Sequence, residues 1–583
     1  MILLLPEAKH VVEKQGRTKP FRAMRFAEDA AGLEALELAK LRFWNRKDIT
    51  LGTAAAEDAL PVHVLHGLPE KQTDNPTLYA KQGYCLDIAQ AELTVYYEHR
   101  AGLINALTSL KQLLTPCDGG YTLPLCEITD YPSLETRAIA QTFSWYAGYG
   151  RLGFDSQLWG YEEWVEYLNI CLDNKINQFN LVMYGYWPFD MPGYPETSLR
   201  DVPMKIWNAE NRRWLTVRYT HPNLEEPFLD KFIALAHKLE VKIFAYVGLN
   251  SYNGAYSIKH PEARMKPPAS QGFLNDFDSL CLSYPGTREY ILESMRQIAR
   301  LGFDGYTLEE SEEGFWFCEC DECRRKYHAA TKTPGEAKHM ANMELLNQIF
   351  EAVHEINPDA VIGIRAFRQP PLEKDPAFLK HCVESMPKDI KLFWAPGLYV
   401  PEGEFDKWCD AFGKDNIWGR DTESNSITST MGRLYRTFKS NMLRYEDEAN
   451  EQVIETDIRQ HKGSVARGVH GINGFMFEWY GLPMHLFAHG NYGWGSQMDE
   501  EEFYQEACKL NFGDLADDVL YVMKNMLTIH ESQIPLYTTP FPFQKNKVCE
   551  DDIPTILAAK KRHPELMAII RHLQLRAYSD AQL

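Results

Sequence analysis

Two adjacent glutamates, Glu309 and Glu310, directly follow an apolar stretch at residues 302–308. A carboxylate at the end of a buried strand costs several kcal/mol unless it has a partner, so this position favours a functional role. Neighbouring carboxylates also repel each other when both are ionised, which helps one of them to keep a proton. The pair is therefore our first candidate for general acid and base chemistry.

Further acidic, aromatic and basic residues end other apolar stretches in the same way. They are Tyr184, Arg365, Trp394, Asp421, Glu423, Glu478 and Trp479. A carboxylic acid can protonate a glycosidic oxygen, and flat apolar sugar faces stack on aromatic rings. The set therefore favours carbohydrate chemistry, although Trp394 and Trp479 are equally compatible with packing in a core.

Arginines also stand after predicted strands, at Arg365, Arg368 and Arg420. A guanidinium group can bind a carboxylate or a sulfate through two parallel hydrogen bonds. It can equally pair with the acids of the site itself. The arginines therefore leave an anionic sugar, such as a uronic acid or a sulfated N-acetylglucosamine, open as the substrate.

The elements that position these residues alternate between apolar strands and amphipathic helices, from residue 129 to about residue 500. Such alternation builds a parallel sheet, and eight strands fit a closed (β/α)8 barrel of the TIM type. The reacting groups of such a barrel stand at the carboxyl ends of the strands, so we expect the residues above to share one mouth. The predicted strands are 135–141, 178–184, 241–247, 303–309, 360–366, 390–395, 415–419 and 472–478.

The barrel is flanked by two other predicted regions. Residues 1–128 form a small α/β domain, with a first strand at residues 1–6 and helices at 29–41 and 101–114. Residues 129–500 hold the catalytic barrel. Residues 501–583 are helical, with a proline-rich interruption.

Bulk composition excludes several classes of protein. The 583-residue chain has a net charge of -20 and no run rich in lysine or arginine, so nucleic acid is not an expected partner. No stretch has the roughly 20 apolar residues of a membrane span, and the apolar run at residues 1–6 is too short for a signal-peptide core. Twelve dispersed cysteines favour a reducing compartment, and we expect the cytoplasm. The oligomeric state stays open, a homodimer included.

Three cysteines lie close together in the sequence, at Cys318, Cys320 and Cys323. Three thiols at this spacing can ligate zinc, with Cys281 or His328 as the fourth ligand. The segment lacks the two paired Cys-x-x-Cys units of a secure zinc site. We therefore expect packed or redox-sensitive thiols here, and no metal or cofactor.

The first domain resembles the α/β domain that precedes the barrel in β-N-acetylhexosaminidases of glycoside hydrolase family 20. The similarity lies in Gln82-Gly83-Tyr84, which opens a strand, and in the helical sequence 101–114 that begins Ala101-Gly102-Leu103. In the barrel, Arg137 sits where this family carries a sugar-binding arginine, and Glu309-Glu310 sits where it has an Asp-Glu pair. Glu478-Trp479 is similar to the strand end that holds sugar hydroxyls. The family's His-x-Gly-Gly sequence before the pair is absent.

The resemblance implies retaining hydrolysis assisted by the 2-acetamido group of the substrate. Glu310 would be the general acid and then the base that activates water, and Glu309 would orient the acetamido nitrogen. Consecutive strand residues point to opposite faces, so both can serve one site only if the chain turns at Leu308. Glu309 is also one methylene longer than the family's aspartate. For a substrate without an acetamido group, Asp421, Glu423 or Glu478 would have to be the nucleophile or base.

Two other readings stay open. One is a glycoside hydrolase of another specificity, similar to an α-glucuronidase, which also has an α/β domain before a barrel. The other is a barrel that binds carbohydrate at the same mouth without catalysis. The sequence has no glycine-rich phosphate loop, no Gly-x-Ser-x-Gly and no His-Glu-x-x-His, so nucleotide, serine-hydrolase and zinc-protease chemistry have no support.

Overall fold

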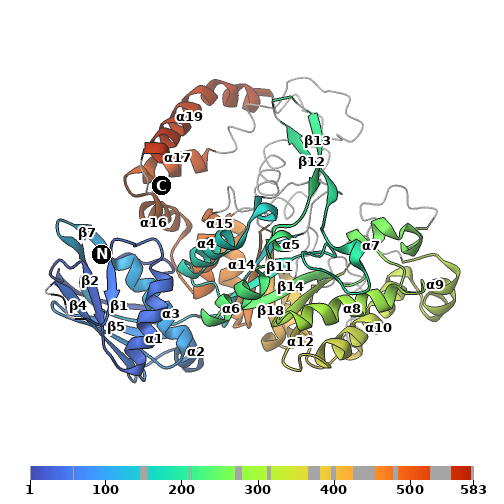
Figure 1. Ribbon diagram of the computed structural model, residues 1–583, viewed down its shortest axis with the longest axis horizontal. Coiled ribbons are helices and arrows are strands. Elements are labelled where there is room, and N and C mark those ends of the chain that lie inside the picture. The colour runs from blue at the N-terminus through green and yellow to red at the C-terminus, as the bar shows by residue number, and fades with distance from the viewer. Residues whose placement is uncertain are drawn as a thin grey trace.

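A seven-stranded sheet, a closed barrel and a set of carboxyl-terminal helices make up the computed structural model (Figure 1). The sheet lies at one side of the barrel, and the last helices lie above both in this view. The residues that the structure describes are 2–54, 56, 58–144, 155–208, 210–211, 213–268, 279–310, 317–365, 381, 383–394, 402–423, 454–476, 483–525 and 553–579.

The first sheet has the strand order β1-β9-β5-β6-β4-β2-β3 and is covered by helices α1 (Ala30–Arg42) and α3 (Arg100–Leu113). Both helices were predicted. The predicted strand at residues 1–6 is wrong, because the first strand begins at His10 and the backbone of Leu5 instead hydrogen-bonds to the side chain of Gln112. The strands are β1 (His10–Arg17), β2 (Ala23–Phe26), β3 (Thr50–Gly52), β4 (Ala59–His66), β5 (Tyr84–Ile88), β6 (Leu93–Tyr97) and β9 (Pro124–Asp130).

Close packing explains the glycines at positions 83 and 102, in the two segments that resemble family 20. Helix α3 crosses the chain at Gly83 so closely that a Cβ atom at Gly102 would lie 2.2 Å from the carbonyl oxygen of Gly83. The next turns of the helix bury Leu103, Leu107 and Leu110 against the sheet. Gly102 therefore sets the distance at which the apolar face of α3 can dock, whereas a Cβ atom at Gly83 would lie 2.4 Å from the carbonyl oxygen of Tyr79.

All eight predicted barrel strands are present, and they close in chain order with parallel pairing throughout. This confirms the TIM-barrel fold. The strands are β10 (Thr136–Thr142), β11 (Gln178–Val182), β14 (Lys242–Gly248), β15 (Gly305–Glu309), β16 (Val361–Arg365), β17 (Lys391–Trp394), β18 (Ile417–Glu423) and β19 (Gly471–Met476).

Helices cover the outside of the barrel (Figure 1). Helix α10 illustrates why they form where they do, because Thr333 caps it by accepting a hydrogen bond from the amide of Glu336 at 3.2 Å and Pro334 occupies its first turn. Its buried face includes Leu345, Leu346 and Ile349. The main barrel helices are α4 (Tyr161–Asp173), α6 (Leu229–Lys238), α8 (Thr287–Arg300), α10 (Pro334–His354), α12 (Glu402–Phe412), α14 (Ile454–Arg467) and α15 (Pro483–Trp494).

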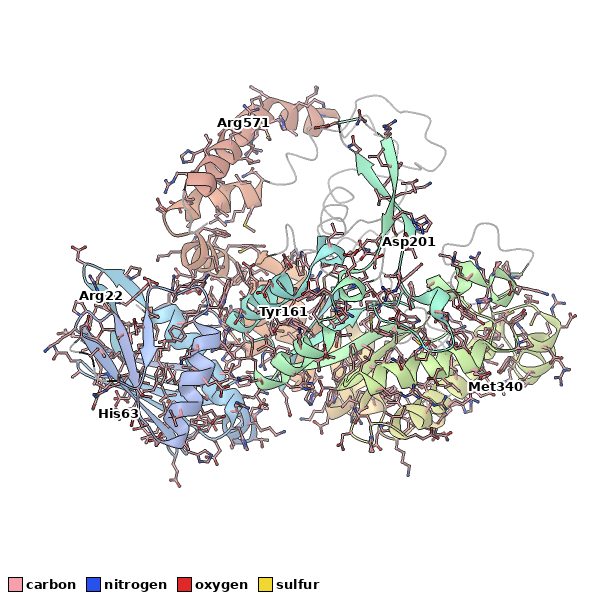
Figure 2. The ribbon with its side chains drawn as sticks, in the orientation of Figure 1. Arg22, His63, Tyr161, Asp201, Met340 and Arg571 are labelled. Carbon is pink, nitrogen blue, oxygen red and sulfur yellow. The ribbon has the colours of Figure 1, made fainter. Side chains whose placement is uncertain are left out.

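A hairpin of β12 (Val202–Asn208) and β13 (Arg213–Tyr219) projects from the barrel between β11 and α6, and it was not among the predicted elements. Figure 2 shows Asp201 near its foot, where the carboxylate accepts a hydrogen bond from Arg218 at 2.6 Å. Just after β13 the buried ring of His221 accepts from the amide of Asn223 at Nδ1 (3.1 Å), which leaves Nε2 to donate to the carbonyl of Phe143 (3.0 Å). Burial lowers the pKa of His221 to about 4.

The carboxyl-terminal region is helical, with α16 (Glu500–Phe512), α17 (Ala516–Lys524) and α19 (Ile553–Ser579). Phe503 and Tyr504 of α16 share a buried apolar cluster with Met484 and Tyr492 of α15. Among the described residues, no helix combines the length and the apolar character needed to cross a membrane.

The first domain and the barrel are joined by a buried charged cluster around Asp130, the last residue of β9. Its carboxylate accepts hydrogen bonds from Lys175 Nζ (2.7 Å), Tyr84 Oη (2.8 Å) and Trp494 Nε1 (2.9 Å). The ammonium group of Lys175 also lies over the ring of Trp494, 4.1 Å from its centre. Because Lys175 precedes β11 and Trp494 ends α15, this Asp130 cluster closes the amino-terminal end of the barrel against the first domain.

Candidate active site

Inward-facing side chains fill the barrel in layers. Contacts between side chains in the lower layers identify which residues of each strand point inward. Asn180 and Asn473, on the two strands that flank β10, share a hydrogen bond of 2.7 Å across the interior. Above the amino-terminal rim, the ring of Phe244 lies beside Gly305, where a Cβ atom would come within 2.7 Å of the ring. Since inward residues alternate along each strand, Thr307 and then Glu309 continue upward on the inner face of β15.

Glu309 is the last residue of β15 and only 1% exposed. The hydroxyl group of Tyr184 donates a hydrogen bond to its Oε2. The backbone carbonyl of Glu309 accepts from Ser251 Oγ (3.0 Å) and from the amide of Leu249 (2.8 Å), which fixes the strand end to the loop after β14. A buried carboxylate is therefore held in one orientation at the carboxyl-terminal mouth of the barrel.

Tyr184, two residues beyond β11, is itself fixed on two sides. Its ring stacks on Tyr252, with centres 4.3 Å apart and planes 26° apart, and meets the edge of Tyr246 at 5.5 Å. Its backbone has a positive φ of 46°, which an ordinary side chain adopts only where the surroundings enforce it. Tyr184 thus lies at the mouth as the sequence predicted, and the structure shows it contacting the candidate carboxylate.

Glu310 takes a different direction from Glu309. Its Oε1 accepts a hydrogen bond of 2.9 Å from Asn342 on α10, the helix outside the strand, and the residue is half-buried. His339 lies one turn earlier on α10, and burial lowers its pKa to about 4 while the charge of Glu310 acts in the opposite sense. The chain does not turn at Leu308, since β15 continues through Glu309, and strand alternation therefore directs the two carboxylates away from each other in this structure.

Several other predicted site residues occupy the carboxyl-terminal halves of neighbouring strands. Arg365 is the backbone partner of Glu309 and ends β16, while Trp394 ends β17. Asp421 and Glu423 lie on β18, with Glu423 at its end. The backbone therefore places these four around the same mouth as Glu309. Their side chains lie outside the described part of the structure, as do the whole of Glu478, Trp479 and Arg368.

Arg137, which was predicted to bind sugar, lies near the start of its strand and away from the end where Glu309 stands. Arg137 is the second residue of β10, at the amino-terminal end of the barrel, and a strand rises about 3.3 Å per residue, so the mouth lies about 17 Å away. Its guanidinium group donates to the carbonyls of Leu134 and Lys175 (both 2.7 Å) and to Gln82 Oε1 (2.8 Å). Burial lowers the pKa of Arg137 to about 9. Arg137 borders a cavity of about 180 Å³ at this closed end.

Part of the chain is similar to a known protein family. Residues 10–131 match the family model described as glycosyl hydrolase family 20, domain 2. This part of the chain resembles the second domain of family 20 proteins. No curated protein sequence matches the chain.

Solved structures share the fold of this chain. An exo β-N-acetylglucosaminidase of the family from Vibrio harveyi is 13% identical, with a TM-score of 0.60 over 90% of this chain and 78% of that one. A Streptomyces plicatus N-acetyl-β-hexosaminidase is 14% identical, with a TM-score of 0.56 over 87% and 93%. A β-N-acetylhexosaminidase from Bacteroides fragilis is 13% identical, with a TM-score of 0.56 over 90% and 96%. At these identities the likeness establishes the fold.

The structure places several residues that were not predicted from the sequence around Glu309 and Glu310. Ser251, Tyr252 and Tyr246 come from β14 and the loop after it, and His339 and Asn342 come from α10. The signal for the last two was present, because polar residues three apart lie on one helical face that is otherwise apolar. His339 also borders a cavity of about 630 Å³ on the outer side of α10. That cavity lies away from Glu309 and is not the barrel mouth.

The four cysteines considered as metal ligands lie together. The sulfur atoms of Cys281, Cys318, Cys320 and Cys323 are all within 4.8 Å of one another. His328 is not a member of this group, because its Nε2 hydrogen-bonds to the backbone carbonyl of Cys318 at 3.1 Å. Of the two candidates for a fourth position beside Cys318, Cys320 and Cys323, the fold therefore selects Cys281.

Proposed function

We propose that this protein is a glycoside hydrolase that removes terminal N-acetylhexosamine residues with retention of configuration. The observation that carries the proposal is the buried carboxylate of Glu309, which stands at the carboxyl-terminal mouth of the barrel and is oriented by the hydroxyl of Tyr184. The shared fold with named hexosaminidases adds support. A fixed carboxylate at this place suits a group that must be aligned before the substrate reacts.

The proposed reaction uses the substrate's own acetamido group as the nucleophile. Glu309 accepts a hydrogen bond from the acetamido nitrogen and stabilises the positive charge that develops there as the carbonyl oxygen attacks the anomeric carbon. A bicyclic oxazolinium ion, which keeps the N–H proton, forms while the glycosidic bond breaks, and Glu310 donates its proton to the leaving oxygen. Water then attacks the anomeric carbon while Glu310 takes a proton from it, the bond from the anomeric carbon to the ring oxygen of the oxazolinium breaks, and the acetamido group is restored with overall retention of configuration.

Glu310 must leave its contact with α10 to take this part. Asn342 donates to one oxygen of Glu310, so a proton carried by Glu310 resides on the other oxygen. In the proposed cycle the side chain exchanges the amide of Asn342 for the glycosidic oxygen of the substrate. The half-buried position of Glu310 is consistent with this movement, whereas Glu309 is fully enclosed.

The test compares two substrates that differ only in the acidity of the leaving group, an activated nitrophenyl and a poor alkyl β-N-acetylglucosaminide. Loss of an acid slows the poor leaving group most, because that group needs the proton in the transition state. Glu310→Gln should therefore lose at least about a hundredfold on the alkyl glycoside and much less on the nitrophenyl one. Glu309→Gln should slow both substrates equally. Glu351→Gln, an exposed glutamate on α10, is the matched control and should leave both rates unchanged.

The set of glycosides that the protein cleaves distinguishes this proposed function from the alternative functions. Wild-type protein should cleave N-acetylglucosaminides or N-acetylgalactosaminides and leave the matching glucosides, which have no acetamido group, untouched. Equal rates on glucosides, or cleavage of glucuronides alone, would assign another specificity. Sugar binding with no turnover of any of these substrates would assign a carbohydrate-binding barrel.

A further inference from the structure

We propose that Cys281, Cys318, Cys320 and Cys323 form a structural zinc site. Their sulfur atoms all lie within 4.8 Å of one another, and the Cys281 sulfur lies 3.6 Å from that of Cys320 and 3.7 Å from that of Cys323. Three of the four residues are buried and the fourth, Cys320, is half-buried. This inference stands apart from the proposed hydrolase activity.

The sulfur distances fit a tetrahedron around zinc. Zinc binds thiolate sulfur at about 2.3 Å, so the sulfur atoms of a tetrahedral site stand about 3.8 Å apart. The two distances from Cys281 agree with this edge length. A disulfide needs its two sulfur atoms about 2.05 Å apart, so neither of these pairs is disulfide-bonded. A compact set of four thiols is the ligand set that zinc occupies in structural sites.

The ligands come from two separate loops, which is typical of a structural clamp. Cys281 lies in the segment that follows β14 and precedes α8, 39 residues before Cys320. Cys318 and Cys320 follow β15, and Cys323 lies in helix α9 (Asp321–Lys326). The site therefore joins the loops of two adjacent barrel strands, beside the backbone hydrogen bond that the amide of Glu319 donates to the carbonyl of Lys266 at 2.8 Å.

Backbone groups around the sulfur atoms are arranged as they are around bound thiolates. The amide of Lys266 donates to the sulfur of Cys318 (3.3 Å), and the amide of Cys323 donates to the sulfur of Cys320 (3.4 Å). Ser283 Oγ lies 3.2 Å from the sulfur of Cys323. The two amide donors stabilise sulfur in its ionised form and orient it toward a metal. His328 supports the site from outside by its hydrogen bond to the carbonyl of Cys318.

The expectation from the sequence was packed or redox-sensitive thiols with no metal. That expectation rested on the spacing of the three clustered cysteines, which by itself supplies too few ligands for a closed site. The fold adds Cys281 as the fourth. Cys318 lies eight residues after Glu310 in the sequence.

Metal analysis of the purified full chain tests the proposal. The protein is prepared under reducing conditions without an affinity tag, and bound metals are measured by inductively coupled plasma mass spectrometry. We expect about one zinc per chain. Cys281→Ser and Cys318→Ser should each retain at least about tenfold less zinc, whereas Cys117→Ser, an exposed cysteine, and Cys171→Ser, a buried one in α4, should retain it.

A second measurement covers the case in which the ligand variants fail to fold. A mercurial reagent added to wild-type protein should release zinc in proportion to the thiols it blocks, and Co²⁺ in place of zinc should give thiolate charge-transfer absorption and intense tetrahedral visible bands. Wild-type protein that is free of zinc and binds Co²⁺ without those bands would overturn the proposal. A disulfide between any two of the four cysteines, found by peptide mass mapping of unreduced protein, or iron in place of zinc would overturn it as well.

Discussion

Replacing Tyr184 by phenylalanine isolates the contact on which the candidate site depends. The substitution removes one hydroxyl and keeps the ring, so the stacking on Tyr252 and the edge contact with Tyr246 remain. What is lost is a buried hydrogen bond to the carboxylate of Glu309. Hydrogen bonds to charged groups contribute about 1.5–3 kcal/mol, which corresponds to roughly a 10- to 150-fold change in rate if the contact is used in the transition state.

The proposal predicts where that loss appears. Glu309 acts on charge that develops during the reaction, so Tyr184→Phe should lower kcat by this factor and change KM little. The loss should be the same for good and poor leaving groups, because proton donation by Glu310 is untouched. The assay is steady-state hydrolysis of the nitrophenyl and alkyl N-acetylglucosaminides, with circular dichroism and Tm as the check on folding.

Tyr306→Phe is the matched control. Tyr306 lies on the same strand as Glu309 but points outward, where its hydroxyl donates to the carbonyl of Met295 at 2.8 Å. This change removes a buried hydrogen bond outside the mouth and should cost about 0.5–1.5 kcal/mol of stability with kcat unchanged. Wild-type kcat in a folded Tyr184→Phe variant would refute the role given to the Tyr184–Glu309 contact, and an equal loss in Tyr306→Phe would show that the effect is not specific to the mouth.

Three further predictions concern the surrounding structure. Asp130→Ala leaves the buried ammonium of Lys175 without its counter-charge and should lower the free energy of unfolding by about 3–5 kcal/mol, measured by urea denaturation. Burial lowers the pKa of His221 to about 4 from an unfolded value near 6.5, so the unfolded chain binds the extra proton between these values. Neutral His221 thus contributes up to about 3 kcal/mol to the free energy of unfolding above pH 6.5, and this contribution is lost as the pH falls toward 4. His221→Asn should therefore flatten that part of the curve of unfolding free energy against pH. Asn342→Leu frees Glu310 from α10 and should change hydrolysis of the alkyl glycoside by about tenfold or less, with a smaller change for the nitrophenyl one; equal effects on the two substrates would contradict a role through Glu310.

The barrel strands could be predicted from the sequence because a parallel strand is buried on both faces and therefore appears as an unbroken apolar run. Tyr184 and Glu309 were found by the same rule, since each stands where such a run ends. Arg137 was assigned from the family resemblance and not by this rule, and it stands at the start of β10, opposite the strand end that the rule selects. The hairpin of β12 and β13 was missed because its outward residues, such as Arg213 and Trp214, are exposed and give no buried strand pattern.

Other parts of the site depend on contacts between distant segments, which no local pattern contains. The side chains of Glu309 and Glu310 point in different directions because β15 continues through Glu309 and does not end at Leu308. The pairing of Glu310 with Asn342 needs the docking of α10. The fourth thiol, Cys281, reaches the others only because two barrel loops lie side by side.

The Asp130 cluster constrains the order in which this chain can be assembled. Asp130 precedes the first barrel strand, and the indole of Trp494 that hydrogen-bonds to it comes 364 residues later. During synthesis the first sheet and Lys175 emerge long before that tryptophan. We expect the barrel strands that are made before α15 to form an open, partly hydrated sheet, in which water still reaches the ion pair of Asp130 and Lys175. When α15 packs against the cluster, it excludes that water and holds the last strand, β19, beside the first, β10.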